Sequence, residues 1–158
     1  MNGAAIHKLN LPEFEFRTEN RNGLLFIFDE FRGKWIRLTP EEWVRQNFIR
    51  YLTEHKGFPG PLIALEKRVD INGLSQRFDL LVYNRRGAPL LVAEFKSPAI
   101  RVSQLAFDQA VRYNSELKAP YVVVSNGLAH YVCHIDFTEG KAVYLSEVPD
   151  FAGLTEAD

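Results

Sequence analysis

Two stretches of this chain decide its fold, Arg77-Phe-Asp-Leu-Leu-Val-Tyr83 and Pro89-Leu-Leu-Val-Ala-Glu-Phe-Lys96. Both are nearly continuous runs of apolar residues, which is typical of strands that are covered on both faces of a sheet. The residues between them, Asn84-Arg-Arg-Gly-Ala88, have the composition of a turn, so we expect the two stretches to pair as an antiparallel hairpin. Asp79 and Glu94 interrupt the two runs, and the pairing register decides how close these carboxylates come.

A hairpin centred between Arg86 and Gly87 sets Asp79 directly opposite Glu94. Cross-strand partners share a face of the sheet, with Cβ atoms about 4.5–5.5 Å apart. Strand alternation then predicts that Lys96 lies on the same face as Glu94. That face is expected to carry Asp79, Leu81 and Tyr83 with Leu90, Val92, Glu94 and Lys96. The opposite face is expected to carry Phe78, Leu80, Val82, Leu91, Ala93 and Phe95.

A third strand is predicted over residues 62–71, joined to the first stretch through Asn72-Gly73. Both central residues of a type I′ turn need positive φ, which this dipeptide tolerates. A tight turn here places Glu66 opposite Asp79, so that three carboxylates line up across three strands. Leu74-Ser-Gln76 could instead lengthen the loop and shift the register. Glu66 would then be an edge charge paired with Lys67 and Arg68.

Working outward, Thr39-Pro-Glu-Glu42 predicts the start of a helix, with Thr39 as N-cap and Glu42 closing a capping box. A second helix is expected from the Ser103 cap to about Leu117, and further strands over 121–125, 130–135 and 141–145. The predicted fold is α/β (α+β), a central mixed sheet flanked by helices within a single domain, 1–158. Residues 1–38 would form an N-terminal β-hairpin extension that turns at Gly33, residues 39–146 the core, and residues 147–158 a tail that is frayed from Gly153.

Composition sets limits on function. The net charge is −1, but residues 119–158 hold one basic and six acidic side chains, so any phosphate-facing surface should lie in the first 118 residues. A single cysteine, Cys133, fits a reducing compartment. The sequence has neither a transmembrane run nor the basic-then-apolar order of a signal peptide. We therefore expect a cytoplasmic protein without membrane association, and an oligomer is compatible with the sequence.

The paired carboxylates suggest a metal site. Two like charges in a partly dry place repel each other, and a divalent cation removes that penalty. Mg²⁺ or Mn²⁺ could bind between Asp79 and Glu94, take the backbone carbonyl of Phe95, and gain Glu66 if the tight register holds. Lys96 would steady or deprotonate a metal-bound water. The alternative is that Asp79 or Glu94 makes an ordinary salt bridge with Lys96 and Arg77 at the rim of the sheet.

Several segments together resemble the PD-(D/E)XK nuclease superfamily, and within it the N-terminal nuclease domain of type I restriction enzyme R subunits and its small stand-alone relatives. They are Pro40-Glu-Glu-Trp-Val-Arg-Gln46, Arg77-Phe-Asp-Leu-Leu-Val-Tyr83, Leu91-Val-Ala-Glu-Phe-Lys-Ser-Pro98, Gln109-x-x-x-Tyr113 and Ser125-Asn-Gly127. The resemblance implies a restriction-endonuclease-like fold and Mg²⁺-dependent hydrolysis of DNA.

Carried over by position, the resemblance implies Asp79 and Glu94 as metal ligands and Lys96 as the catalytic lysine. It also implies that Gln109 and Tyr113 flank the site from the following helix. Without the resemblance, the pair is better explained by an ordinary amphipathic helix, with Gln109 at its border and Tyr113 in the core. An acidic residue of the first helix often completes such sites. Glu41 is favoured over Glu42, which the capping box already uses. Arg45 would hold the Glu41 carboxylate or contact a phosphate, and Arg77 is the other candidate for substrate binding.

Two departures from the family pattern matter. Phe78 stands where the motif has its proline. The chain also lacks the Gly-x-x-x-x-Gly-Lys-Ser/Thr signature of an ATP-driven motor, so a separate motor or specificity protein would have to act on DNA with it. Three hypotheses follow: an Mg²⁺-dependent restriction-type nuclease, a catalytically silent module that binds nucleic acid or a restriction or repair partner, and a structural domain whose carboxylates only form salt bridges.

Overall fold

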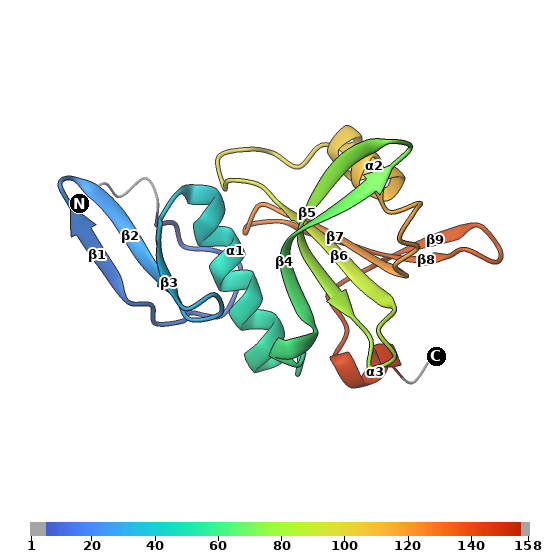
Figure 1. Cartoon of the computed structure of the whole chain (residues 1–158), viewed down its shortest axis with the longest axis horizontal. Coiled ribbons are helices and arrows are strands. Elements are labelled where there is room, and N and C mark those ends of the chain that lie inside the picture. The colour runs from blue at the N-terminus through green and yellow to red at the C-terminus, as the bar shows by residue number, and fades with distance from the viewer. Residues whose placement is uncertain (1–5, 156–158) are drawn as a thin grey trace.

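The computed structural model describes residues 6–155 and contains two β-sheets (Figure 1). The smaller sheet has the order β1 (Thr18–Arg21), β2 (Leu24–Asp29), β3 (Lys34–Arg37). The larger sheet follows chain order through β4 (Ile63–Ile71), β5 (Leu74–Tyr83), β6 (Pro89–Phe95), β7 (Tyr121–Ser125), β8 (His130–Asp136) and β9 (Lys141–Leu145). The pair β6 and β7 is parallel and the other pairs are antiparallel, so the predicted mixed sheet is confirmed.

The N-terminal sheet is a three-stranded meander that packs beside the first helix (Figure 1). The expected turn at Gly33 is present, with a φ of 68°. The first turn was not predicted, although Asn22-Gly23 carries the same signal as Asn72-Gly73, with φ values of 53° and 84°. The inner face of this sheet buries Leu25 and Ile27 in a small apolar cluster of its own.

Helix α1 (Pro40–Arg50) covers one face of the large sheet and buries Val44 and Phe48 completely. The predicted N-cap is confirmed, because the Thr39 hydroxyl accepts a hydrogen bond from the backbone N–H of Glu42 at 3.1 Å. The Glu42 carboxylate, however, bonds to arginine and glutamine side chains. A π-helical turn (Tyr51–His55) and a 3₁₀ turn (Gly60–Leu62) connect α1 to β4.

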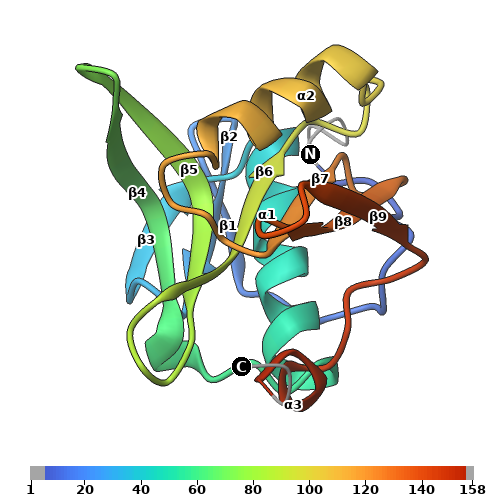
Figure 2. The same cartoon turned by 90° about the vertical axis from the view of Figure 1, so that its right-hand side faces the viewer.

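Helix α2 (Gln104–Tyr113) forms the crossover between the parallel strands β6 and β7 and lies on the other face of the sheet (Figure 2). Its predicted N-cap, Ser103, accepts a hydrogen bond from the N–H of Ala106. The helix ends at Tyr113, before the expected Leu117. The reason is Asn114, whose side chain bonds to both the N–H and the carbonyl of Ala119 and so stabilises a turn in place of another helical turn.

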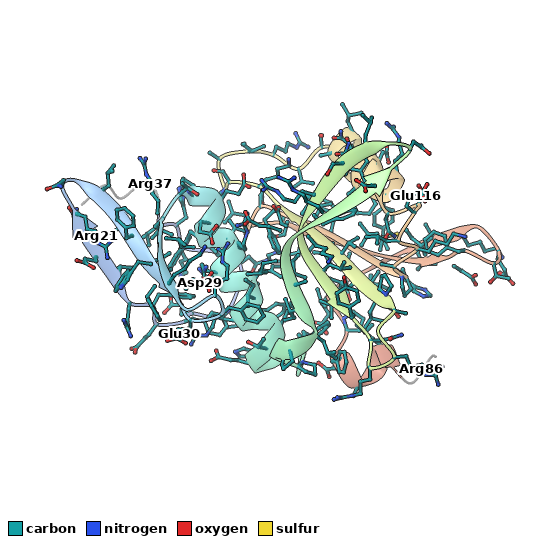
Figure 3. All side chains as sticks on the ribbon, viewed as in Figure 1. Arg21, Asp29, Glu30, Arg37, Arg86 and Glu116 are labelled. Carbon is teal, nitrogen blue, oxygen red and sulfur yellow. The ribbon has the colours of Figure 1, made fainter. Side chains whose placement is uncertain are left out.

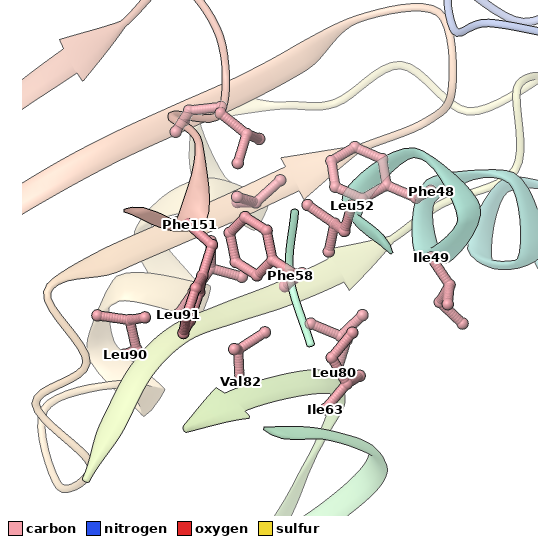
Figure 4. Packing of buried hydrophobic residues seen from close by; sticks show 14 of the residues in the cluster. Phe48, Ile49, Leu52, Phe58, Ile63, Leu80, Val82, Leu90, Leu91 and Phe151 are labelled. Atoms are coloured by element: carbon pink, nitrogen blue, oxygen red, sulfur yellow. The ribbon is translucent and has the colours of Figure 1, made fainter. Parts of the chain in front are cut away.

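The main core lies between α1 and the sheet, where Phe48 and Leu52 pack against Leu80 and Leu91 (Figure 4). The short helix α3 (Phe151–Thr155) closes this core with Phe151 and Leu154, which are 5% and 2% exposed. The expectation of a tail from residue 147, frayed from Gly153, is therefore wrong as far as residue 155, because two apolar side chains anchor the segment. Residues 156–158 of that tail lie outside the described residues.

Both predicted hairpin registers are confirmed. Leu80 pairs with Ala93 and Val82 with Leu91, the register that sets Asp79 beside Glu94. Ile71 pairs with Leu74 across the Asn72-Gly73 turn, the register that sets Glu66 beside Asp79.

Two face assignments are wrong. Leu90 joins the α1 side because a bulge between Val82 and Tyr83 shifts the register by one residue. Phe78 joins the α2 side. The pairing of β4 with β5 is interrupted at Glu66, whose φ is 53°, and Phe78 pairs with Lys67 directly beside this interruption. Among residues 6–155, no helix is long and apolar enough to cross a lipid bilayer.

Candidate active site

Asp79 lies where β5 passes close to β6 and α1. One carboxylate oxygen, Oδ2, accepts a hydrogen bond of 2.7 Å from the backbone N–H of Phe95. The other, Oδ1, lies 3.3 Å from Nη2 of Arg45 on α1. The hairpin register and these two contacts hold the Asp79 carboxylate beside the strand that carries Glu94 and Lys96.

Three carboxylates and one lysine influence one another's charge here: Glu41, Asp79, Glu94 and Lys96. Burial, reinforced by the charge of Asp79, raises the pKa of Glu94 to about 8, while Lys96 acts in the opposite direction. Burial and then the charge of Asp79 also raise the pKa of Glu41, again opposed by Arg45 and Lys96. Carboxyl groups whose pKa values are raised by burial and by an acidic neighbour are typical of functional sites, so this cluster is a candidate active site.

A cavity of about 150 Å³ opens on the α2 side of the sheet beside this cluster. Half of the ten predicted site residues line it: Arg77, Glu94, Lys96, Gln109 and Tyr113. Ala106, Ala110 and Val124 complete the lining. The parallel pairing of β6 with β7 places Lys96, because its backbone N–H donates to the carbonyl of Ser125 at 2.8 Å. The side chain of Gln109 donates to the Tyr113 hydroxyl at 2.6 Å, so this pair faces the cavity as one unit.

Glu41 and Glu42 have different surroundings, which bears on the choice between them. The Glu42 side chain is 10% exposed and bonds to Arg32 and Arg45, each at 2.8 Å. Glu41 is 46% exposed, and its pKa reflects the charges of Asp79 and Lys96. The engagement of Glu42 by two arginines favours Glu41 as the helix residue of the site, and this choice stays a prediction. The reason for setting Glu42 aside was wrong, since ion pairs and not a capping box occupy its carboxylate.

Two predicted residues lie in the ion-pair cluster behind the site. Arg45 has a side chain only 8% exposed and contacts four carboxylates, so of its two predicted roles the structure supports holding carboxylates. Glu66 extends its carboxylate to Arg32 and Arg45, at 3.4 and 3.5 Å. The alternative partners Lys67 and Arg68 are not the ones it contacts.

Sequence reasoning missed Asp29 and Arg32, which form an ion pair at the end of the N-terminal sheet. Figure 3 shows Asp29 on the side of that sheet toward α1, whereas Arg21 lies at the far end. Asp29 is completely buried. The position of Asp29 directly after the apolar stretch Leu24–Phe28 was a signal for a buried carboxylate. The other two partners of Arg32, Glu42 and Glu66, lie 10 and 34 residues away in the sequence and so left no local pattern.

The donor set suits a hard divalent cation in part. Asp79 and Glu94 offer carboxylate oxygens, the ligands that Mg²⁺ and Mn²⁺ prefer, and Mg²⁺ commonly binds through one or two carboxylates with waters and phosphate oxygens completing the shell. Within the described range, 6–155, no group of three or more histidine, cysteine, aspartate or glutamate side chains is arranged to hold a metal ion. A cation here would therefore depend on the two carboxylates, backbone carbonyls, water and substrate.

Comparison with protein families gives one match. Residues 40–149 match the family described as "Type I restriction enzyme R protein N terminus". The matched segment includes every predicted site residue, from Glu41 to Tyr113. No curated protein is significantly similar to the chain.

Solved structures are also similar to this chain, two of them as follows. The first is a fragment of a putative HsdR subunit of a type I restriction enzyme from Vibrio vulnificus YJ016, with a TM-score of 0.56 and 24% identity, which covers 73% of this chain and 24% of that one. The second is a DrdV–DNA complex, with a TM-score of 0.42 and 16% identity, covering 73% of this chain and 11% of that one. The first confirms the expected restriction-endonuclease-like fold, and this chain spans about a quarter of its length.

Proposed function

Because this chain belongs to the family of the type I restriction enzyme R protein N terminus, we propose that its restriction-type, nuclease-like domain hydrolyses DNA phosphodiester bonds with Mg²⁺ or Mn²⁺. Asp79 and Glu94, with the backbone carbonyl of Phe95, would hold the cation. When bound, the cation would activate water and offset the charge that develops on the phosphate. The remaining steps belong to side chains of the chain itself.

Lys96 would orient the attacking water and stabilise charge in the transition state from its place beside Glu94. Gln109 and Tyr113, joined by their hydrogen bond, would fix the substrate side of the cavity. Arg77, an exposed residue on the cavity wall, would contact a phosphate. Glu41 would share the cation-facing side with Asp79. We propose that a separate motor or specificity protein delivers DNA to the site.

One observation carries this proposal. The confirmed register of β5 and β6 brings Asp79 beside Glu94, and the same cavity holds Glu94, Lys96, Gln109 and Tyr113. A family match alone would be compatible with a decayed site. The presence of Asp79 beside the strand that carries Glu94, with Glu94, Lys96, Gln109 and Tyr113 lining one cavity, supports an intact site.

The first test is metal binding. Calorimetry with Mn²⁺ is expected to show one site in the wild type and none in Asp79→Ala. The absence of binding in the wild type would contradict the proposed metal site.

The second test is a plasmid-nicking assay that compares the wild type with Lys96→Ala. Lys141→Ala serves as matched control, because Lys141 is 75% exposed and lies on β9. Cleavage should require Mg²⁺ or Mn²⁺, fall at least about 100-fold in Lys96→Ala, and persist in the control. Equal cleavage by all three proteins would identify a contaminating nuclease.

A second candidate function is a catalytically silent module that binds DNA or a restriction partner. The observation that favours it is the engagement of both Asp79 oxygens, one by Arg45 and one by the Phe95 N–H. Because both Asp79 oxygens already contact protein groups, a cation would have to displace those contacts, which weakens its binding. Binding of duplex DNA in a gel-shift assay, without metal binding and without cleavage, would support this function over the first.

A further inference from the structure

Resting on the proposed function, we propose that the N-terminal sheet is part of the metal centre. In this proposal Arg32 is a positioning residue that acts through Glu42 and Arg45 on the metal ligand Asp79. None of the segments that resemble the nuclease superfamily contains Arg32, and the family match begins only at residue 40. The inference rests on a continuous series of ion pairs that runs from the turn after β2 to β5.

The series begins at a rigid anchor. Oδ1 of the buried Asp29 accepts hydrogen bonds from the backbone N–H groups of Phe31 and Arg32, at 2.9 and 3.0 Å. The other oxygen of Asp29, Oδ2, accepts a hydrogen bond from Nε of Arg32. Because backbone and side chain hold Asp29 together, the Arg32 guanidinium has a fixed origin, and its remaining nitrogens point out of the N-terminal sheet.

Arg32 then joins two other parts of the fold. Its Nη2 donates to Oε1 of Glu42 on α1 at 2.8 Å, and its Nη1 approaches Glu66 on β4 at 3.4 Å. A guanidinium presents several donors in a fixed planar arrangement, so one arginine can set the distances among three carboxylates. A lysine ammonium lacks that geometry.

Glu42 passes the constraint to Arg45. Oε2 of Glu42 accepts a hydrogen bond from Nη1 of Arg45 at 2.8 Å, and Oε1 of Glu42 accepts one from the Gln46 side chain at 3.0 Å. Arg45 in turn contacts Asp79. Nε of Arg45 is buried and has no hydrogen-bond partner within residues 6–155, and the polar contacts of this guanidinium in that range are all with carboxylates.

Loss of Arg32 would therefore disturb the contact between Arg45 and Asp79 at the other end of the series of ion pairs. Glu42 and Glu66 would depend more heavily on Arg45 and draw it away from Asp79. Removing a positive charge would by itself strengthen binding of a cation, because the surroundings become more negative. A loss of metal affinity would consequently report lost positioning, whereas a gain would report charge alone.

The experiment is calorimetry with Mn²⁺ alone, on the full chain, for the wild type, Arg32→Gln and Arg32→Lys. Two controls match the side effects of these changes. Arg21→Gln removes the same charge from an exposed arginine of the same sheet, paired there with Glu19. Ile27→Val loosens the buried face of that sheet without changing charge. Thermal unfolding of each variant establishes that it is folded at the temperature of the titration.

We expect Arg32→Gln and Arg32→Lys to bind Mn²⁺ about 10-fold more weakly than the wild type, a typical effect for groups that orient metal ligands. Arg21→Gln and Ile27→Val should match the wild type. Unchanged or tighter binding by Arg32→Gln would overturn the proposal, as would an equal loss in Ile27→Val. Either result leaves the metal site itself intact, whereas an absence of binding in the wild type would refute the proposed function together with this inference.

Discussion

Arg45 on α1 and Asp79 on β5 lie 3.3 Å apart, so a buried guanidinium directly contacts a candidate metal ligand. The same guanidinium is 2.8 Å from Glu42, whose side chain is also largely buried. A buried arginine shared between carboxylates is costly to disturb, because removal of one partner leaves an uncompensated charge. The stability of the fold and the geometry of the site therefore depend on one side chain.

Arg45→Met tests this dependence. We expect it to destabilise the protein by about 3–5 kcal/mol, the usual cost of leaving a buried carboxylate unpaired. Urea unfolding monitored by circular dichroism measures the change. The double variant Arg45→Met/Asp79→Asn should recover part of the loss, since within residues 6–155 the ion pair of Asp79 is with Arg45 and the second change removes the charge left unpaired. A single variant as stable as the wild type would show that the cluster contributes nothing to folding.

Glu94 should make the metal-free protein less stable as pH rises. Its pKa in the folded state is about 8 and its ordinary value is 4.5. Between these values the folded protein retains a proton that the unfolded chain has lost, so the free energy of unfolding falls by up to about 1.4 kcal/mol per pH unit. The raised pKa of Glu41 acts in the same direction.

Unfolding in urea with EDTA at pH 5, 7 and 9 measures this decline, and Glu94→Gln should flatten much of it. Saturating Mn²⁺ should restore stability most strongly above pH 8, where Glu94 is already ionised. A wild-type profile that rises from pH 5 to pH 9 would contradict the raised pKa of Glu94, which comes first from burial and then from Asp79.

Tyr113→Phe removes the hydroxyl that accepts the hydrogen bond of Gln109. We expect a change in stability of no more than about 1 kcal/mol, because the bond lies at the surface, together with a clear loss of DNA cleavage. The matched control is Gln104→Ala, which removes a similar bond, Gln104 to Asp108 at 2.8 Å, from the same helix. Equal cleavage by both variants would assign the Gln109–Tyr113 pair to the helix surface alone.

Gly127 is confined by both its backbone and its neighbours. Its φ is +85°, and an added Cβ would lie 2.7 Å from a methyl group of Leu9 and 3.1 Å from one of Val44. Gly127→Ala should therefore destabilise the protein by about 1–3 kcal/mol. Gly33→Ala has a similar φ, +68°, but open space, and should cost less. Thermal melts of the two variants separate steric crowding from backbone strain, and equal melting temperatures would exclude the crowding.

The sequence predicted those parts of the fold that local chemistry determines. The turn at Asn72-Gly73 set the register of the first hairpin, and Thr39 and Ser103 marked the starts of both long helices. The predicted register of the second hairpin holds from Leu80 to Val82, on the far side of a bulge from its turn. The faces of Phe78 and Leu90 were wrong because a bulge and a left-handed Glu66 break the alternation that the prediction assumed. Neither irregularity has a signature in the residues around it.

The candidate site divides in the same way. Asp79, Glu94 and Lys96 could be placed relative to one another, because a single hairpin carries all three. Arg32 could not be placed, since its partners on α1 and β4 come together only after the chain folds. The choice of Glu41 over Glu42 stays a prediction, and it rested on a capping role that the Glu42 side chain does not perform.

The ion pair between Arg32 and Glu42 also bears on how the protein can be divided in the laboratory. A truncated version that contained only residues 40–149 would keep Glu42 and Arg45 but lose Arg32. It would also lose Phe151 and Leu154, which fill the end of the main core. The stretch that sequence similarity marks out is thus smaller than the cooperative unit, and expression plasmids should extend from before Asp29 to beyond Leu154.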